Sequence, residues 1–306
     1  MPRHPASRPP HYPLLVPLDV TVSVPASSAN LGPGFDCLAA ALPLRLVVRV
    51  VGRPGPFDVS ISGEGAETLP TDATNLIAAT MLDGGDGNGL AMRVDNGLPL
   101  ASGCGSSAAA IVAGLALRDA IAGRPLDPAR LLVDAAAVEH HPDNLAAAIY
   151  GGITLASNDP VVARRIDPPA DLAFVLVIPA EQLATTRARA ALPAEVPREH
   201  AVYNVQRTAF LVHGLLSSDF DSIRLGLGDR LHQDQRVHLT PTYASLRGRL
   251  AAVGAFGVTL SGAGPSILLW CQAADAEAVA SWTSAIVPGA RVTAMRPELR
   301  GLVVAA

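Results

Sequence analysis

The sequence contains no lysine, and all 23 of its Lys or Arg residues are arginine. A Walker-type phosphate loop requires its lysine and a Schiff-base enzyme requires a lysine amine, so both kinds of site are excluded. Charged residues make up 16% of the chain, and the formal net charge is -4. A chain of this charge offers no broad basic surface to neutralise many phosphates, and we expect no nucleic-acid partner.

Cysteine and long apolar stretches are scarce too. Cys37, Cys104 and Cys271 have no paired spacing, which fits neither a disulfide framework nor a zinc site and indicates a reducing, cytoplasmic compartment. No apolar run approaches the roughly 20 residues that cross a bilayer, so we expect no membrane partner. Residues 1–17 combine several prolines with scattered Arg and His, a pattern typical of a disordered leader and not of a secretory signal.

The sequence does contain enough apolar residues for two domains. Its 306 residues are 49% hydrophobic, and two cores side by side are the default at this length. Strand patterns at Val20–Val24 and Leu44–Val51 flank an expected loop with a short helix. Residues 107–121 are largely Ala, Val, Leu and Ile, which predicts a helix buried on most of its circumference. Mixed strands, helices and hairpin returns favour α+β sandwiches over a doubly wound parallel sheet.

The composition shifts between Ser157 and Ala170, where Asn, Asp and Pro accumulate. Such a stretch is typical of a domain boundary. We therefore predict a leader over residues 1–17, an N-terminal domain over residues 18–165 and a C-terminal domain over residues 166–306.

A loop rich in glycine and serine, Pro99–Ala108, precedes the apolar helix. Gly103 and Gly105 let the backbone turn its amides inward. Ser106 and Ser107 then lie at the helix N-terminus, where free N–H groups and the helix dipole favour a negative ligand. The same residues are equally compatible with an ordinary helix N-cap, so this loop alone leaves both interpretations open.

A polar cluster, Glu139–Asn144, lies between two apolar, alanine-rich stretches. Its carboxylates, Glu139 and Asp143, are hard oxygen ligands of the kind that Mg²⁺ prefers, and Asn144 can hold a substrate hydroxyl or a phosphate oxygen. The alternative is a solvated turn between helices, capped by Asp143. His140 and His141 form a zinc pair only with a second pair of ligands, and we find none at suitable spacing.

Three segments, taken together, resemble the three motifs of the GHMP kinases in the same order and spacing. They are Ala26–Asp36 (ASSANLGPGFD), the loop Pro99–Ala108 and Gly257–Ser266 (GVTLSGAGPS). The resemblance runs from about Val20 to Val292. It implies an α+β fold of two domains, an N-terminal ribosomal-protein-like β-α-β domain that binds ATP and a C-terminal ferredoxin-like α/β sandwich. It also implies an ATP-dependent phosphotransferase with an alcohol as acceptor.

Within that superfamily, the first motif and the His141–Asn144 cluster resemble the homoserine kinases, as do the segments Tyr203–His213 and Asp229–Arg236. This resemblance implies transfer of the γ-phosphoryl group of Mg-ATP to the side-chain hydroxyl of L-homoserine, on the way to threonine. Another GHMP kinase, acting on mevalonate, shikimate or a sugar, and a non-catalytic binding protein with the same fold are the alternatives. The oligomeric state stays open, with a homodimer as one option.

By this resemblance, Asn30, Asp143 and Asn144 are the expected catalytic residues. Asp36 is expected to hold the ammonium group of homoserine, Arg189 and Arg236 its carboxylate, and His141 and Thr185 make further substrate contacts. Ser107 and Glu139 are the expected Mg²⁺ ligands. The residues expected to bind ATP are Asn75, Pro99, Leu100, Ala101, Ser102, Gly103, Cys104, Gly105, Ser106, Ser107, Ala108, Gly262 and Gly264.

Relatives that resemble mevalonate kinase pair their catalytic aspartate with a lysine, which this chain lacks. The resemblance to the homoserine kinases implies a site without a strong general base, in which Asp143 and Asn144 orient the hydroxyl more than they deprotonate it. The chain also departs from the family pattern at Cys104, at Ser266 and at Asp234–Gln235, which replaces a Pro-Tyr pair before Arg236.

Overall fold

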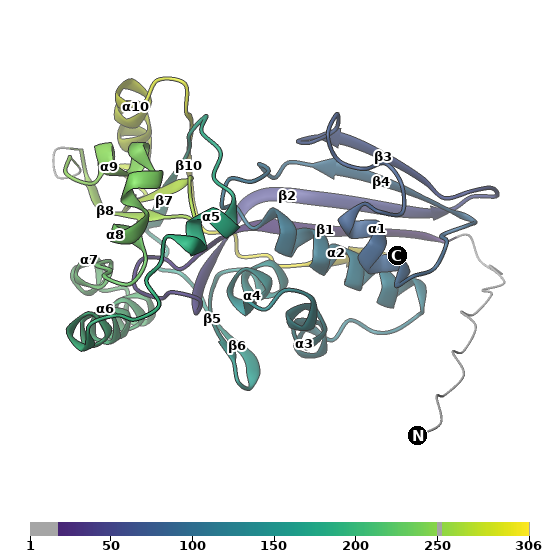
Figure 1. Cartoon of the computed structure of the whole chain (residues 1–306), viewed down its shortest axis with the longest axis horizontal. Coiled ribbons are helices and arrows are strands. Elements are labelled where there is room, and N and C mark those ends of the chain that lie inside the picture. The colour runs from purple at the N-terminus through teal and green to yellow at the C-terminus, as the bar shows by residue number, and fades with distance from the viewer. Residues whose placement is uncertain (1–17, 250–252, 306) are drawn as a thin grey trace.

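Two β-sheets organise the chain, and each belongs to its own domain (Figure 1). The computed structural model describes residues 18–249 and 253–305. Seven strands form the N-terminal sheet and four form the C-terminal sheet. Among the described residues, no helix is both long and apolar enough to span a membrane.

The N-terminal sheet is built around the antiparallel pair β1 (Asp19–Ala29) and β2 (Leu38–Gly52). Alternate valines of β1 are fully or almost fully buried, as β-branched residues facing a core should be. β4 (Leu90–Asn96) and β3 (Asp58–Gly63) extend the sheet beyond β2. The segment between β1 and β2 forms turns and no helix over residues 30–37, so the short helix expected there is wrong.

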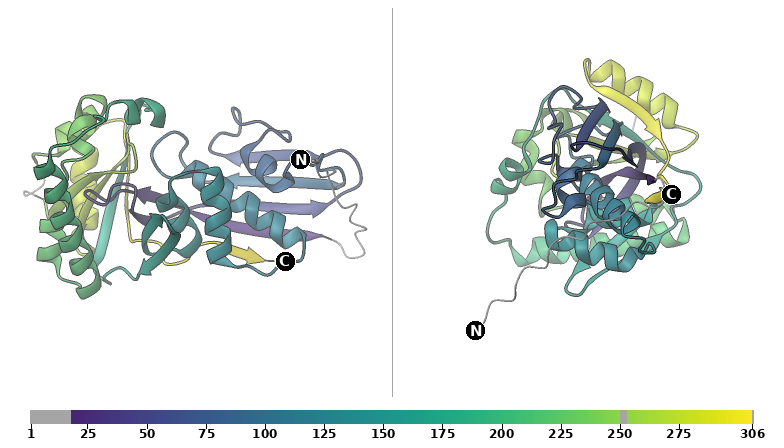
Figure 2. Two further views of the ribbon diagram at one scale, coloured as in Figure 1. Left: turned by 60° about the horizontal axis from the view of Figure 1, so that its bottom comes forward. Right: turned by 90° about the vertical axis from the view of Figure 1, so that its right-hand side faces the viewer.

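Helices cover this sheet (Figure 2). α2 (Ser106–Ile121) and α4 (Pro142–Tyr150) pack on β1 and β2, with α1 (Leu76–Leu82) and α3 (Pro128–Val138) beside them. Eleven of the sixteen residues of α2 are buried, because its alanines let neighbouring elements approach closely on most sides. The prediction of a buried helix here is confirmed.

The C-terminal sheet has the strand order β10-β7-β9-β8, with all neighbours antiparallel. Its strands are β7 (Leu172–Ile178), β8 (Ala255–Leu260), β9 (Ile267–Gln272) and β10 (Arg291–Met295). Helices occupy the β7–β8 connection, and α10 (Ala276–Ile286) lies between β9 and β10. This is the β-α-β-β-α-β order of a ferredoxin-like sandwich.

The β7–β8 connection contains several helices among the described residues. They are α5 (Thr185–Ala190), α6 (Arg198–Ser217), α7 (Phe220–Gly226), α8 (Gln233–Arg236), the 3-10 helix η1 (Val237–Leu239) and α9 (Pro241–Leu246). Most are short, because glycine, proline or an aspartate cap interrupts the chain every few residues.

The expected boundary region is largely a hairpin. β5 (Ile153–Asn158) pairs with β2 and with β6 (Val161–Ile166), so the polar residues at 158–160 form its turn. The chain leaves this hairpin of the N-terminal sheet after Ile166.

The end of the chain does not stay in the C-terminal domain. β11 (Val303–Ala305) pairs with β1 in the N-terminal sheet, and Nη2 of Arg45 donates to the carbonyl oxygen of Gly301 at 2.8 Å. The assignment of residues 166–306 to one domain is therefore wrong for this last strand.

Candidate active site

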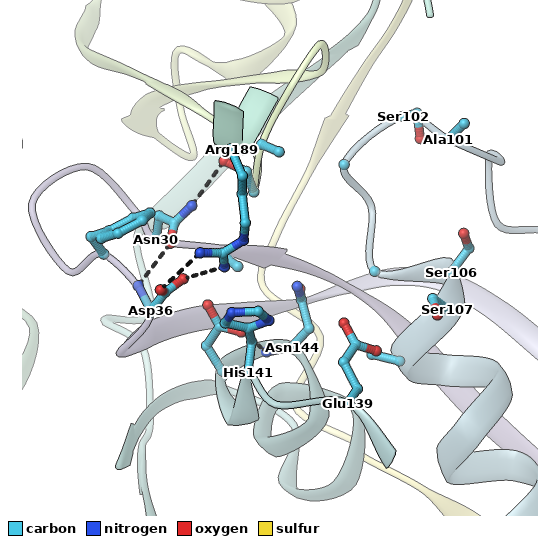
Figure 3. Close-up of a pocket in the computed structure, with 18 of the residues that line it drawn as sticks. Asn30, Asp36, Ala101, Ser102, Ser106, Ser107, Glu139, His141, Asn144 and Arg189 are labelled. Carbon is cyan, nitrogen blue, oxygen red and sulfur yellow. Dashed lines mark hydrogen bonds and ion pairs between the residues drawn. The ribbon is translucent and has the colours of Figure 1, made fainter. Parts of the chain in front are cut away.

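A cavity of about 300 Å³ lies where the two domains meet. The β1–β2 turn, the loop before α2 and the α3–α4 turn line it from the N-terminal domain. Residues of α5, of α8 and of the β8–β9 turn line it from the other domain. Figure 3 shows Asn30, Asp36 and Arg189 on one side of this site and Ser102, Ser106 and Ser107 on the other. Segments far apart in sequence therefore form one site.

The glycine-serine loop presents the N-terminus of α2 to this cavity. Gly105 is the N-cap residue, with a φ of 68°, and no side chain of the described chain caps the helix. A Cβ on Gly105 would lie 2.1 Å from Oγ of Ser27, so glycine is required here. The free N–H groups and the dipole of a sixteen-residue helix favour an anion at this end. The absence of a side-chain cap favours the phosphate-loop interpretation over the ordinary N-cap.

Hydrogen bonds connect the three sequence motifs. Oγ of Ser261 donates to the carbonyl oxygen of Gly103 at 2.7 Å. The backbone N–H of Ser266 donates to the carbonyl oxygen of Ser102 at 3.1 Å. Nδ2 of Asn30 donates to the carbonyl oxygen of Gly262 at 2.8 Å. The loop before α2 is thus held against the β8–β9 turn, which in turn is held by the β1–β2 turn.

Glu139 lies at the C-terminal end of α3 and lines the cavity. Its Oε2 is buried and has no hydrogen-bond partner among the described residues. Burial raises the pKa of this carboxyl, and the charge of Arg189 partly opposes the shift. A buried carboxylate oxygen without a donor is suited to a cation, and the hydroxyl of Ser107 lines the same cavity. These two residues fit a Mg²⁺ ion that also binds nucleotide phosphates.

Within residues 18–249 and 253–305, no group of three or more His, Cys, Asp or Glu side chains could hold a metal ion by itself. Magnesium ions in kinases are typically held by one or two carboxylates together with substrate phosphates. One carboxylate, that of Glu139, lines the cavity together with the hydroxyl of Ser107, which fits this pattern.

Asp143, in the first turn of α4, is almost fully buried, at 2% exposure. Burial raises the pKa of Asp143 to about 7. The backbone N–H of Asn144 donates to Oδ1 of Asp143 at 2.7 Å and opposes this shift. The nearby carboxylates of Asp36 and Glu139 raise the pKa further. Oδ1 of Asn144 accepts a hydrogen bond from Oγ of Ser27 at 2.8 Å. The carboxyl of Asp143 therefore titrates near neutral pH, beside an amide of fixed orientation.

Charged groups from both domains meet on another side of the cavity (Figure 3). Nη2 of Arg189 donates to Oδ1 of Asp36 at 2.9 Å, and Nη1 donates to Oδ2 at 3.3 Å. The backbone N–H of Asp36 donates to Oδ1 of Asn30 at 3.0 Å. The β1–β2 turn thereby presents the Asp36 carboxylate to α5.

Arg236 is buried to 1% exposure and lines the same part of the cavity. Its Nε donates to the carbonyl oxygen of Ala188 at 3.1 Å, but no carboxylate of the described chain lies within 4 Å of its guanidinium. Burial lowers its pKa to about 10, and the charge of Arg189 adds to the shift. Arg236 is still cationic at neutral pH, and a buried cation of this kind requires an anionic partner.

The chain matches two domain families. Residues 70–152 match the GHMP kinases N terminal domain, and residues 211–285 match the GHMP kinases C terminal domain. A homoserine kinase of Desulfitobacterium hafniense is 38% identical over 267 residues, which are 85% of this chain and 90% of that protein. One of Moorella thermoacetica is 39% identical over 258 residues, 82% of this chain and 87% of that one. The chain belongs to the homoserine kinase family of the GHMP kinases.

Similarity to solved structures agrees with this family assignment. A homoserine kinase from Cytophaga hutchinsonii matches with a TM-score of 0.85 and 28% identity, over 94% of this chain and 97% of that one. A mevalonate kinase, 13% identical with a TM-score of 0.67 over 92% of this chain and 99% of that one, shows the fold alone. The expected superfamily, the two-domain α+β fold and the class of ATP-dependent kinase are confirmed.

Most of the residues expected from the resemblance to the homoserine kinase family come together in the cavity. Those that line it are Asn30, Asp36, Ala101, Ser102, Gly103, Gly105, Ser106, Ser107, Ala108, Glu139, His141, Asp143, Asn144, Arg189, Arg236 and Gly262. Sequence reasoning missed Ala29, Phe35 and Ala263. The ring of Phe35 lies 5.7 Å from the guanidinium carbon of Arg189 and 5.6 Å from that of Arg236. Phe35 and Ala263 lie inside recognised motifs, so the signal for them was present.

Five residues expected to bind the nucleotide do not line the cavity: Asn75, Pro99, Leu100, Cys104 and Gly264. Asn75 is buried and caps α1, because its Oδ1 accepts from the N–H of Ile77 at 3.0 Å. Cys104 is buried, with Sγ 3.8 Å from Oγ of Ser266. Asn75 thus holds the start of α1, and Cys104 contacts the β8–β9 turn. The side chain of Thr185 lies outside the described part of the structure.

Proposed function

We propose that this protein transfers the γ-phosphoryl group of ATP to the side-chain hydroxyl of L-homoserine, forming O-phospho-L-homoserine and ADP on the way to threonine in the cytoplasm. The observation that carries the proposal is Arg236, a buried guanidinium with no carboxylate within 4 Å in the described chain. It lines the same cavity as the carboxylate of Asp36 and the uncapped N-terminus of α2.

The charges of the cavity support an amino-acid substrate. Asp36 offers a carboxylate to an ammonium group, and Arg189 and Arg236 offer guanidinium groups to a carboxylate. Hydrogen bonds to charged groups contribute about 1.5–3 kcal/mol each. A sugar brings no anion to the buried Arg236, and mevalonate brings no ammonium group to Asp36.

The nucleotide would lie across the glycine-serine loop. Its phosphates would accept hydrogen bonds from the N–H groups at the N-terminus of α2, and Ser107 and Glu139 would hold Mg²⁺. When bound, this ion supplies neutralisation of the negative charge on the phosphates. In Figure 3, Ser106 and Ser107 lie across the cavity from Asp36 and Arg189, which separates a phosphate side from an amino-acid side.

The hydroxyl of homoserine would attack the γ-phosphorus in line. Phosphoryl transfer depends mainly on positioning and charge neutralisation, because the transition state is loose and the nucleophile needs little activation. Asn30, Asp143 and Asn144 line the same cavity. We assign Asp143 and Asn144 the orientation of the hydroxyl, and Asn30 the support of the substrate beside Asp36.

The test is incubation of the purified protein with ATP, Mg²⁺ and L-homoserine, with the products identified by mass. We expect O-phospho-L-homoserine and ADP in equal amounts. Parallel reactions with mevalonate, shikimate and galactose test the alternative kinases. Turnover of one of these acceptors without turnover of homoserine would contradict the proposal.

A further inference from the structure

The two residues proposed to hold opposite ends of the substrate hold each other in this structure. The guanidinium of Arg189 donates two hydrogen bonds to the carboxylate of Asp36, at 2.9 and 3.3 Å. Asp36 belongs to the β1–β2 turn and Arg189 to α5, so the pair connects the two domains across the cavity. A substrate that uses both residues must first separate them.

We infer that homoserine enters by ion-pair exchange, so that the Asp36–Arg189 pair selects for substrates that carry both charges. This inference rests on the proposed function and concerns the specificity of the same site. An amino acid places its ammonium and carboxylate groups side by side. Inserted between Asp36 and Arg189, it restores an opposite charge to each residue.

A substrate with one charge cannot make this exchange. A hydroxy acid without the ammonium group pairs with Arg189 only by leaving Asp36 without its guanidinium. Arg236 has no carboxylate partner of its own in the described chain, so it offers the carboxylate a site whether or not the pair opens. The pair therefore withholds one particular group, the second guanidinium, from any anion that lacks an ammonium group.

The pair is suited to such an exchange because it is neither fully exposed nor fully buried. The side chain of Arg189 is 36% exposed and that of Asp36 is 28% exposed. Water screens the separated charges in part, so the exchange is possible. The bidentate geometry still requires that both hydrogen bonds be replaced, and only a zwitterion replaces them on both sides.

The test compares L-homoserine with 4-hydroxybutyrate, which lacks only the amino group. Three variants are used: Asp36→Asn, Arg189→Gln and the double variant. Asp36→Asn removes the charge that holds Arg189 and leaves the guanidinium free. We expect its kcat/KM for 4-hydroxybutyrate to rise about tenfold or more above that of the unsubstituted protein, the size of one charge-assisted hydrogen bond. Its kcat/KM for homoserine should fall.

The double variant distinguishes two causes of a gain. One is the release of Arg189, and the other is the loss of repulsion between the Asp36 carboxylate and the carboxylate of the substrate. If the gain comes from the freed guanidinium, it disappears in the double variant, and Arg189→Gln alone shows no gain. A gain that persists in the double variant, a gain in Arg189→Gln, or no gain in Asp36→Asn would each overturn the inference. An unchanged KM for ATP in all three variants shows that the rest of the site is intact.

The result is separable from the proposed function. The unsubstituted protein tests that function through its turnover of homoserine. The ratio of the two substrates across the variants tests the ion-pair exchange. If the unsubstituted protein turns over homoserine but the ratio of kcat/KM for the two substrates does not change among the variants, only the ion-pair exchange is overturned.

Discussion

Nη1 of Arg236 lies 3.0 Å from Nδ1 of His232, and the other ring nitrogen of His232 lies 2.8 Å from the carbonyl oxygen of Gly32. A carbonyl oxygen only accepts, so Nε2 carries the proton and Nδ1 accepts from the guanidinium. Burial lowers the pKa of His232 and keeps the ring neutral. The ring also stacks on Phe35, with centroids 5.0 Å apart. His232 therefore connects Arg236 to the β1–β2 turn.

His232→Ala should raise the KM for homoserine about tenfold, because Arg236 loses a charge-assisted hydrogen bond that fixes its fork. The KM for ATP should change less than about twofold, because His232 does not contact the proposed nucleotide site and distant sites affect each other little. His232→Gln can accept from Arg236 and donate to Gly32, so it should recover most of the loss. The exposed His238 provides the control, His238→Ala. Equal rises in both KM values would indicate a general structural role.

Gly105→Ala should impair the use of ATP. The φ of Gly105 is 68°, and an added Cβ would lie 2.1 Å from Oγ of Ser27. Gly123→Ala is a matched control, because Gly123 has a φ of 67° but no atom of the described residues lies within 4 Å of the added Cβ. Both variants carry a left-handed backbone strain of about 1–2 kcal/mol. Only Gly105→Ala should raise the KM for ATP, and equal kinetics in the two variants would remove the loop from the phosphate site.

Much of this site could be predicted from the sequence because its motifs are local. The glycines before α2, the cluster at Glu139–Asn144 and the β1–β2 turn each occupy a short segment whose residue types indicate their chemistry. The helix α2 was equally clear, since a long run of alanine and aliphatic residues fits only a buried position.

Other features could not be predicted because they depend on distant contacts. His232 and Gly32 are 200 residues apart, and a lone histidine gives no sign of such a partner. β11 has three residues and forms only because β1 offers an open edge. The role of Asn75 as the cap of α1 was not predicted either, because it depends on the exact helix start.

Asp143→Asn tests whether Asp143 orients the hydroxyl or removes its proton. The amide keeps the size and one acceptor oxygen of the carboxyl, so the orienting role predicts a fall in kcat of only a few fold. A general base typically contributes about 10²- to 10⁴-fold. A fall in that range, measured by steady-state kinetics at saturating homoserine and ATP, would show that Asp143 accepts the proton.

The same variant should change how stability depends on pH. The pKa of Asp143 rises from 3.8 to about 7 on folding, so the folded state binds the proton more tightly than the unfolded state. The stability associated with that proton is fully present below pH 3.8 and is lost as the pH rises through 7. Because Asn does not titrate, the stability of Asp143→Asn relative to the unsubstituted protein should increase by about 2–3 kcal/mol between pH 5 and pH 8.5.

Denaturant unfolding of the ligand-free protein and of Asp143→Asn at both pH values measures this difference. A difference that stays constant with pH would show that Asp143 titrates at its ordinary pKa in the folded protein.

The measurement that tests the account most directly is the kinetics of Arg236→Gln. The variant removes a buried charge with no carboxylate partner among the described residues, so we expect it to fold, and the exposed Arg198 provides the control Arg198→Gln. The account predicts that the KM for homoserine rises by at least about tenfold, the effect of a lost charge-assisted hydrogen bond, while the KM for ATP is unchanged. An unchanged KM for homoserine in Arg236→Gln would contradict it.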